Sequence, residues 1–200
     1  MNDAFEDDAT WDDDDEDGLW DDYCLTLVRG ISAEEFLRRI GARPGPRVTG
    51  VSALREETRQ DSHTRMGIGV TEVDGWALGF ETCGIIGISE KYNVPLSAGT
   101  RLVADFQNVN AVTRFVWRED GDLRLDFDPG DPGVRRGSDP DGLLDVLTAA
   151  GFSCEDTTDE DDDEDDGDAD LNAVIEHLTG IRVTDRLIAR ATYLTGTVGP

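Results

Sequence analysis

The sequence predicts an α+β fold, in which an antiparallel sheet of about six strands carries helices packed mainly on one face. Three observations lead to this class. The middle of the chain alternates apolar and polar residues with the period of strands, amphipathic helical segments precede and follow it, and two Asp-Gly pairs mark tight hairpin turns. Strands that follow one another, beside helices that follow one another, are typical of α+β domains.

The first predicted elements are a strand and a capped helix. Residues 23–28 have the aromatic and β-branched composition of a strand. Ser32, with Glu35 three residues later, forms a capping-box pattern, so a helix begins here and a glycine ends it. A connector rich in Pro and Gly at 42–50 then leads to a short charged helix that begins at Ser52.

The middle of the chain predicts a series of short strands joined by turns. They are expected at 66–73, 76–81, 84–88, 100–107, 112–118 and 123–127. The Asp-Gly pairs at 74–75 and 120–121 are the hairpin signals. In the second hairpin, alternation places Leu123, Leu125 and Phe127 on one face of the sheet.

A loop and three helices complete the predicted order. The segment 129–137, with its Gly and Pro residues, predicts a loop. Ser138 or Asp139 caps the next helix. A further helix is expected at 169–178, and Thr184 caps the last one.

Negative charge is concentrated in two segments. The net charge is −27, and residues 1–22 and 155–170 each contain 12 acidic residues and no Lys or Arg, which leaves 21 acidic against 18 basic residues elsewhere. Neighbouring carboxylates repel, and little apolar surface is available to offset the entropy lost on ordering. The sequence therefore predicts an acidic disordered tail at 1–22 and a single domain at 23–200, with a disordered acidic loop at 155–168. Trp11, Leu19 and Trp20 are apolar exceptions, expected to dock on the domain or on a partner.

The charge pattern also restricts the partners. Both acidic segments would be repelled by nucleic-acid phosphates and no basic patch offsets them, so nucleic-acid binding is not expected. No apolar run approaches the roughly 18 residues of a membrane span, and the acidic start differs from a secretory signal, so we expect no membrane contact and a cytoplasmic location. The expected partner is a protein with a basic surface, attracted by the acidic segments.

The residue types that common catalytic and metal sites need are scarce. His63 and His177 are the only histidines, and neither has a Cys or His at the spacing of a zinc site. Two frames that resemble EF-hand loops, around Gly18 and Gly167, lack the closing glutamate. Nucleophile elbows and phosphate-binding loops do not occur. We therefore expect a protein with no cofactor and no catalytic residues.

One candidate ligand site centres on Glu81, which ends an apolar strand. Its carboxylate is expected to pair with Arg101 or Arg114, or to line a pocket with Trp76 and Trp117. The alternative is that both tryptophans belong to the core, because aromatic residues on sheets are more often core residues than ligand-stacking ones.

A second candidate is a group of carboxylates at the end of a predicted strand and the start of a predicted helix. Asp126, Asp128 and Asp141 are the candidate ligands of a divalent metal in a hydrolytic site. The alternative is local: Arg135 and Arg136 pair with nearby acids, and the aspartates shape turns and caps.

Several motifs resemble an uncharacterised actinobacterial family, a domain of unknown function. They are Tyr23-Cys-Leu-Thr-Leu-Val-Arg-Gly30, Gly75-Trp76 with Glu81, Leu96-Ser-Ala-Gly-Thr100, Phe115-Val-Trp-Arg-Glu-Asp-Gly-Asp-Leu-Arg124, Phe127-Asp-Pro129, Gly137-Ser-Asp-Pro-Asp141 and Leu178-Thr-Gly180. The resemblance covers about 20–194 and implies no activity. An immunity-like or regulatory role would rest on it alone.

Two functional hypotheses follow. The first is a non-enzymatic module that binds a protein or a small ligand, with acidic segments that speed the encounter with basic partners. The alternative is a divalent-metal-dependent hydrolase that uses the three aspartates named above.

Overall fold

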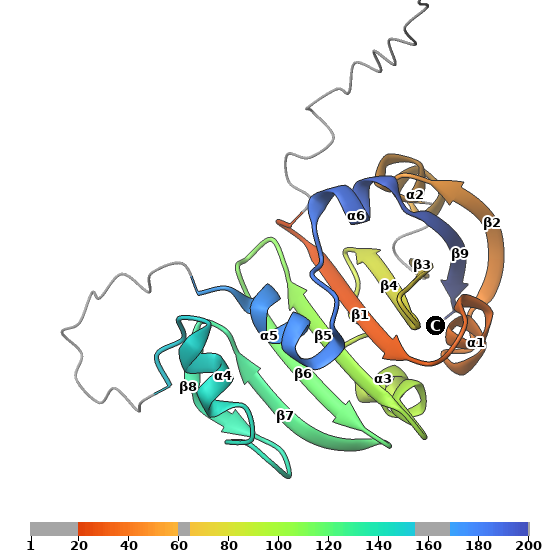
Figure 1. Cartoon of the computed structure of the whole chain (residues 1–200). Coiled ribbons are helices and arrows are strands. Elements are labelled where there is room, and N and C mark those ends of the chain that lie inside the picture. Colours follow the sequence, from red (N-terminus) through yellow and green to blue (C-terminus); the bar gives the residue numbers. More distant parts are fainter. Residues whose placement is uncertain (1–19, 60–64, 155–168, 200) are drawn as a thin grey trace, which may run out of the picture.

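The computed structural model of the protein describes residues 20–59, 65–154 and 169–199. Within these residues, nine strands form one sheet and six helices pack on it (Figure 1). The strands are β1 (Tyr23–Arg29), β2 (Arg43–Thr49), β3 (Met66–Val73), β4 (Trp76–Thr82), β5 (Arg101–Gln107), β6 (Thr113–Glu119), β7 (Asp122–Asp128), β8 (Asp131–Arg136) and β9 (Thr192–Val198). The helices are α1 (Ala33–Arg39), α2 (Val51–Thr58), α3 (Glu90–Ser97), α4 (Leu144–Ala149), α5 (Leu171–Thr179) and α6 (Asp185–Arg190).

Every neighbouring pair of strands is antiparallel. The order across the sheet is β2-β9-β3-β4-β1-β5-β6-β7-β8, so the first strand of the chain lies at its centre. Leu25 of β1 lies opposite Phe80 of β4 on one side and Asp105 of β5 on the other. Because side chains alternate along a strand, this register defines two apolar faces.

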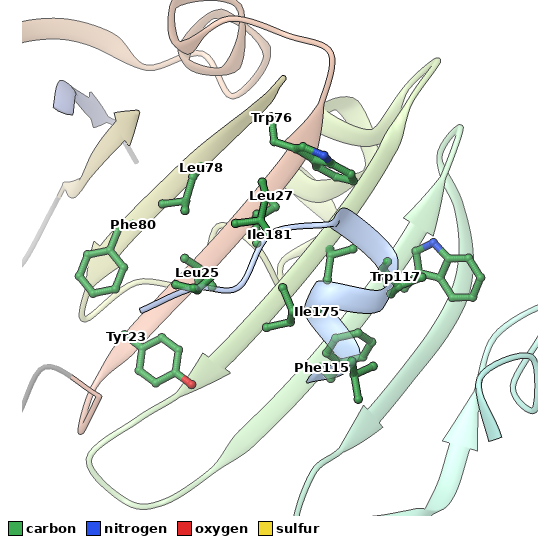
Figure 2. Packing of buried hydrophobic residues seen from close by; sticks show 14 of the residues in the cluster. Tyr23, Leu25, Leu27, Trp76, Leu78, Phe80, Phe115, Trp117, Ile175 and Ile181 are labelled. Carbon is green, nitrogen blue, oxygen red and sulfur yellow. The ribbon is translucent and has the colours of Figure 1, made fainter. Parts of the chain in front are cut away.

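Helices cover both faces. The first, which we call the α5 face, includes Leu25, Leu78 and Phe115 on the strands (Figure 2). It is covered by α2, α4, α5 and α6. The second, the α1 face, includes Val28 and Leu102 and is covered by α1 and α3. The α5 face carries four helices and the α1 face carries two. This agrees with the expectation that helices pack mainly on one face, although the opposite face is also covered.

The α+β class is confirmed, but the expected number of strands is wrong. Three strands were not expected, namely β2, β8 and β9. β2 and β8 contain Pro and Gly, which in the sequence indicate loops. Both are edge strands, where a proline is tolerated because its missing N–H can face away from the sheet. β9 pairs with β2 and β3, which lie far from it in sequence, and local patterns do not reveal such a pairing.

The strand predicted at 84–88 is wrong as well. This segment is a loop over the α1 face, and Ile86 is its buried residue. Its glycines let the backbone approach the sheet closely. A Cβ atom on Gly87 would lie 2.4 Å from Thr26 Oγ1, and one on Gly84 would overlap the Glu81 carboxylate.

A β-bulge changes the facing of one predicted residue. Trp117 pairs with Leu125, but the next residue, Arg118, pairs with Leu123, so β7 contains one extra residue at Arg124. Leu123 therefore packs on the α1 face, whereas Leu125 and Phe127 pack on the α5 face. The expectation that all three share one face is wrong for Leu123.

Most of the helix signals are confirmed by the caps. Ser32 Oγ accepts the backbone N–H of Glu35 at the start of α1, and Thr184 caps α6 in the same way. Asp170 caps α5. The expected cap at Ser138 or Asp139 is wrong, because turns intervene and α4 begins only at Leu144.

The two predicted acidic segments lie almost wholly outside the described residues. Trp20, the first described residue, packs edge-on against Tyr23, with ring centroids 4.9 Å apart, and against Phe80. Docking of Trp20 on the domain, one of the two expected alternatives, is therefore observed. None of the described helices is long and apolar enough to cross a membrane.

Candidate functional site

A pocket of about 450 Å³ lies at the end of the sheet where β1 begins. We call it the Asp105 pocket. At this end of the sheet, β1 and β6 begin, β5 ends, and the first residues of α5 and α6 come close (Figure 1). Its polar wall includes Tyr23, Asp105, Gln107, Thr113, Asp170 and Asp185. Residues far apart in the sequence therefore meet here.

The charged residues that line this pocket are all acidic. Asp105, Asp170 and Asp185 contribute carboxylates, and the described lining includes no Lys, Arg or His. Opposite charges attract more strongly in a partly enclosed site than in bulk water, because fewer waters screen them. The pocket therefore favours a positively charged group.

Asp105 is the most deeply placed of these carboxylates. Its side chain is 8% exposed, and its Oδ2 accepts a hydrogen bond of 2.6 Å from the Tyr23 hydroxyl. Burial raises the pKa of Asp105 to about 6, although hydrogen bonds from Tyr23 and from the backbone of Phe106 act in the opposite direction. Asp105 is therefore mostly ionised at pH 7 and becomes neutral in mildly acidic solution.

Aromatic rings form another wall of the pocket. Tyr23 lies on the α5 face near Phe80, and its hydroxyl is directed towards β5 (Figure 2). Burial, followed by the charge of Asp105, raises the pKa of Tyr23, so the phenol stays protonated and donates to the carboxylate. Trp20 donates its indole N–H to Asp185 Oδ1 at 2.7 Å. Aromatic rings beside carboxylates suit an organic cation, which both attract.

The other two carboxylates differ in their availability. Asp170 caps α5 and pairs with Arg182 at 2.8 Å, and this hydrogen bond lowers the pKa of Asp170. Its charge is therefore partly compensated from outside the pocket. Asp185 is exposed in the first turn of α6. A cation in the pocket would meet Asp105 at the bottom and Asp185 at the rim.

The residues of the predicted Glu81 site lie on opposite faces of the sheet. Trp76 and Trp117 are buried on the α5 face, 5% and 7% exposed, among the core side chains (Figure 2). Arg101 lies over the Trp117 ring, 5.7 Å from its centroid, and pairs with Glu119 rather than with Glu81. Both tryptophans therefore belong to the hydrophobic core, which was the alternative to a ligand pocket.

Glu81 itself is buried on the α1 face, opposite Cys24 of β1. Its Oε2 accepts the backbone N–H of Ile86 at 3.0 Å, and its Oε1 has no hydrogen-bond partner among the described residues. Burial raises the pKa of Glu81 to about 8. Arg114, the other expected partner, pairs with Asp126 instead. The sheet therefore does not bring the five predicted ligand residues into one pocket.

The three predicted metal ligands have separate partners. Asp126 is 2% exposed and pairs with Arg114 at 2.7 Å and with Arg136 at 3.2 Å. Asp128 accepts the Thr113 hydroxyl and a backbone N–H in its turn. Asp141 pairs with Arg135, as the local alternative describes.

No three Asp, Glu, Cys or His side chains among the described residues come together as a metal ion would require. The metal-dependent hydrolase therefore stays a prediction, and these contacts add no support to it.

Sequence reasoning overlooked Asp105 and Tyr23 as site residues. A signal for Asp105 was present, since an aspartate in the apolar strand Leu-Val-Ala-Asp-Phe is an unusual interruption. Nothing local indicated that α5 and α6 complete the pocket.

A larger pocket of about 620 Å³ lies at the opposite end of the sheet and contains Arg29, Arg39 and Arg101. It is a weaker candidate because two of its guanidinium groups already have partners. Arg39 donates to the carbonyl groups of Leu96 and Ala98. Arg101 pairs with Glu119 in the same pocket.

Comparison with known proteins identifies a family for this chain. A family model described as "Family of unknown function (DUF6461)" matches residues 2–200. Neither the curated proteins nor the solved structures provide a match. The resemblance to a domain of unknown function is thereby confirmed, because the match covers nearly the whole sequence. The chain belongs to the DUF6461 family of unknown function.

Proposed function

We propose that this protein is a non-enzymatic binding module whose Asp105 pocket accepts a positively charged group of a protein partner. The observation that supports the proposal is the composition of the pocket wall. Three carboxylates and three aromatic rings, those of Trp20, Tyr23 and Phe152, line it without a basic residue among the described lining. Such a wall attracts guanidinium and ammonium groups and repels anions.

The energetics of Asp105 support the same conclusion. Keeping this carboxylate ionised in a buried position costs free energy, which its raised pKa reflects. A bound cation would offset that cost through a charge-assisted hydrogen bond. The pocket volume of about 450 Å³ falls within the range of small-ligand sites, roughly 300–1,000 Å³. A basic side chain fits this volume.

The distribution of charge supports a role in attraction over longer distances. Two of the residues that line the pocket, Trp20 and Ala169, lie near the ends of the two acidic segments in the sequence. Clusters of like charge raise the rate at which oppositely charged partners meet, and salt weakens this effect. All three cysteines are free thiols, in keeping with the cytoplasmic location that forms part of this proposal.

Binding of arginine-containing peptides to the full chain tests the proposal. We expect the fluorescence of Trp20 to report binding, and affinity to fall when salt is raised from about 50 to about 300 mM. Asp105→Asn should weaken binding at least tenfold, since charge-assisted hydrogen bonds contribute about 1.5–3 kcal/mol. Glu57→Gln removes one exposed negative charge from α2 and serves as the control. Equal loss in both variants would show that only net charge matters.

A further inference from the structure

Two of the most exposed aliphatic side chains among the described residues lie in a turn between two strands that contribute to the Asp105 pocket. Val109 and Val112 are 74% and 51% exposed, and both belong to the turn between β5 and β6. The strands on either side supply Gln107 and Thr113, which line the pocket. Each valine therefore lies within two residues of a side chain that lines the pocket.

The turn that carries these valines is held in one conformation. Asn108 Oδ1 accepts the backbone N–H groups of Asn110 and Val112, at 2.9 and 3.1 Å. The backbone N–H of Asn108 donates to the carbonyl oxygen of Val112, and that of Ala111 donates to the carbonyl oxygen of Asn108. Four hydrogen bonds within five residues therefore order this turn.

The same turn contains a strained residue. Ala111 has a φ of 55°, which is unfavourable for a residue with a Cβ atom. Glycine would adopt this conformation at no steric cost. Strained residues that the surrounding structure holds in place are frequent at functional sites, which makes this turn a candidate contact surface.

From this arrangement we infer that the partner presents a peptide segment with two anchors. A basic side chain enters the Asp105 pocket, and an aliphatic side chain of the same segment packs on Val109 and Val112. The inference rests on the proposed function and adds to it the chemical class of the ligand. Free amines lack the second anchor. Nucleic acids and anionic lipids carry the charge that the pocket repels.

Rigid presentation of the valines favours this mode of binding. Because the turn is already ordered, little conformational entropy is lost when a partner covers it. Removing one aliphatic contact from the peptide should therefore weaken binding about tenfold, from the transfer of its apolar surface out of water. The basic anchor contributes independently, since it meets other side chains.

The test uses the full chain and four short peptides that differ at two positions. One peptide contains Arg and Leu, one Arg and Ser, one Gln and Leu, and one Gln and Ser. Methylguanidinium serves as a small cation without a second anchor. We expect the peptide with Arg and Leu to bind about tenfold more tightly than the peptide with Arg and Ser. Methylguanidinium should compete with both arginine peptides.

The double variant V109S/V112S should abolish the preference for Leu and leave the affinity for methylguanidinium unchanged. Both valines are exposed, so the fold should tolerate these substitutions. Val134→Ser, at an exposed position of β8, is the matched control and should retain the preference.

The outcomes separate this inference from the proposed function. Equal affinity for the two arginine peptides in the wild type, or a preference for Leu that persists in V109S/V112S, would overturn the second anchor and leave the cation pocket standing. If neither methylguanidinium nor an arginine peptide binds, or if Asp105→Asn does not weaken their binding, the proposed function fails and the inference fails with it.

Discussion

Glu81→Gln should stabilise the protein in alkaline solution. The Glu81 carboxyl is 1% exposed, and burial raises its pKa from 4.5 to about 8. The folded protein therefore binds this proton more tightly than the unfolded chain does. Stability is highest at low pH as far as this group is concerned, and it falls as the pH rises from 4.5 through 8.

The size of the effect follows from these two pKa values. Each pH unit between them corresponds to about 1.4 kcal/mol, so the full penalty approaches about 5 kcal/mol. This figure is an upper limit, because the loop over Glu81 can relax. Between about pH 6.5 and 8 the wild type should lose about 2 kcal/mol. Asp105 adds little in this window, since its pKa is about 6, and burial keeps Cys24 in the thiol form.

Urea unfolding at several pH values across this window measures the effect. The free energy of unfolding of Glu81→Gln should vary less with pH than that of the wild type, and the variant should be the more stable protein above pH 8. Glu57→Gln, at an exposed position, should follow the wild type. If the pH dependence of Glu81→Gln parallels that of the wild type, Glu81 is not the buried group that titrates, and the reasoning fails.

Three further outcomes are expected. Cation binding to the Asp105 pocket should weaken up to tenfold per pH unit below about pH 6, because Asp105 gains a proton. An affinity that does not change with pH in calorimetric titrations across this range would show that Asp105 is not involved. Asp126→Ala should lower the free energy of unfolding by about 2–3 kcal/mol, because Arg114 and Arg136 lose their shared partner; denaturant melts that match the wild type would contradict this. Gly180→Ala should lower the free energy of unfolding by about 1 kcal/mol, because φ is 77° at this helix end, while no atom lies near the added methyl group. An unchanged melting temperature would show that alanine is not strained at this position.

Local signals in the sequence were sufficient for much of the fold. Both Asp-Gly turns form hairpins, with positive φ at Asp74 and Asp120 as such turns require. Ser32 and Thr184 cap the helices that their spacing predicts. These features depend on residues a few positions apart, so a single sequence carries them.

Pairings over long distances could not be read in the same way. β9 has strand-like residues, among them the buried Tyr193, but its neighbours are residues 43–49 and 66–70, and no local pattern links them. The candidate site has the same limitation. Asp105 interrupts an apolar strand in the sequence, whereas its meeting with Asp185 depends on how α6 packs.

Glu81 shows why the predicted ligand residues did not converge. Along β4, Trp76 and Glu81 are five positions apart, so alternation directs them to opposite faces. Arg114 and Trp117 on β6 are separated in the same way. An odd spacing within a single strand already excluded a shared pocket, and the parity of these positions was the signal to use.

Prolines at both margins of the sheet restrict how other chains can approach it. Pro44 and Pro46 in β2 and Pro132 in β8 cannot donate backbone hydrogen bonds, so neither outer strand offers an unbroken template to an incoming strand. Copies of this protein are thereby hindered from stacking edge to edge into fibrils. In the binding mode proposed above, recognition would fall instead to side chains at the ends of the strands, where specificity depends on chemistry rather than on backbone geometry.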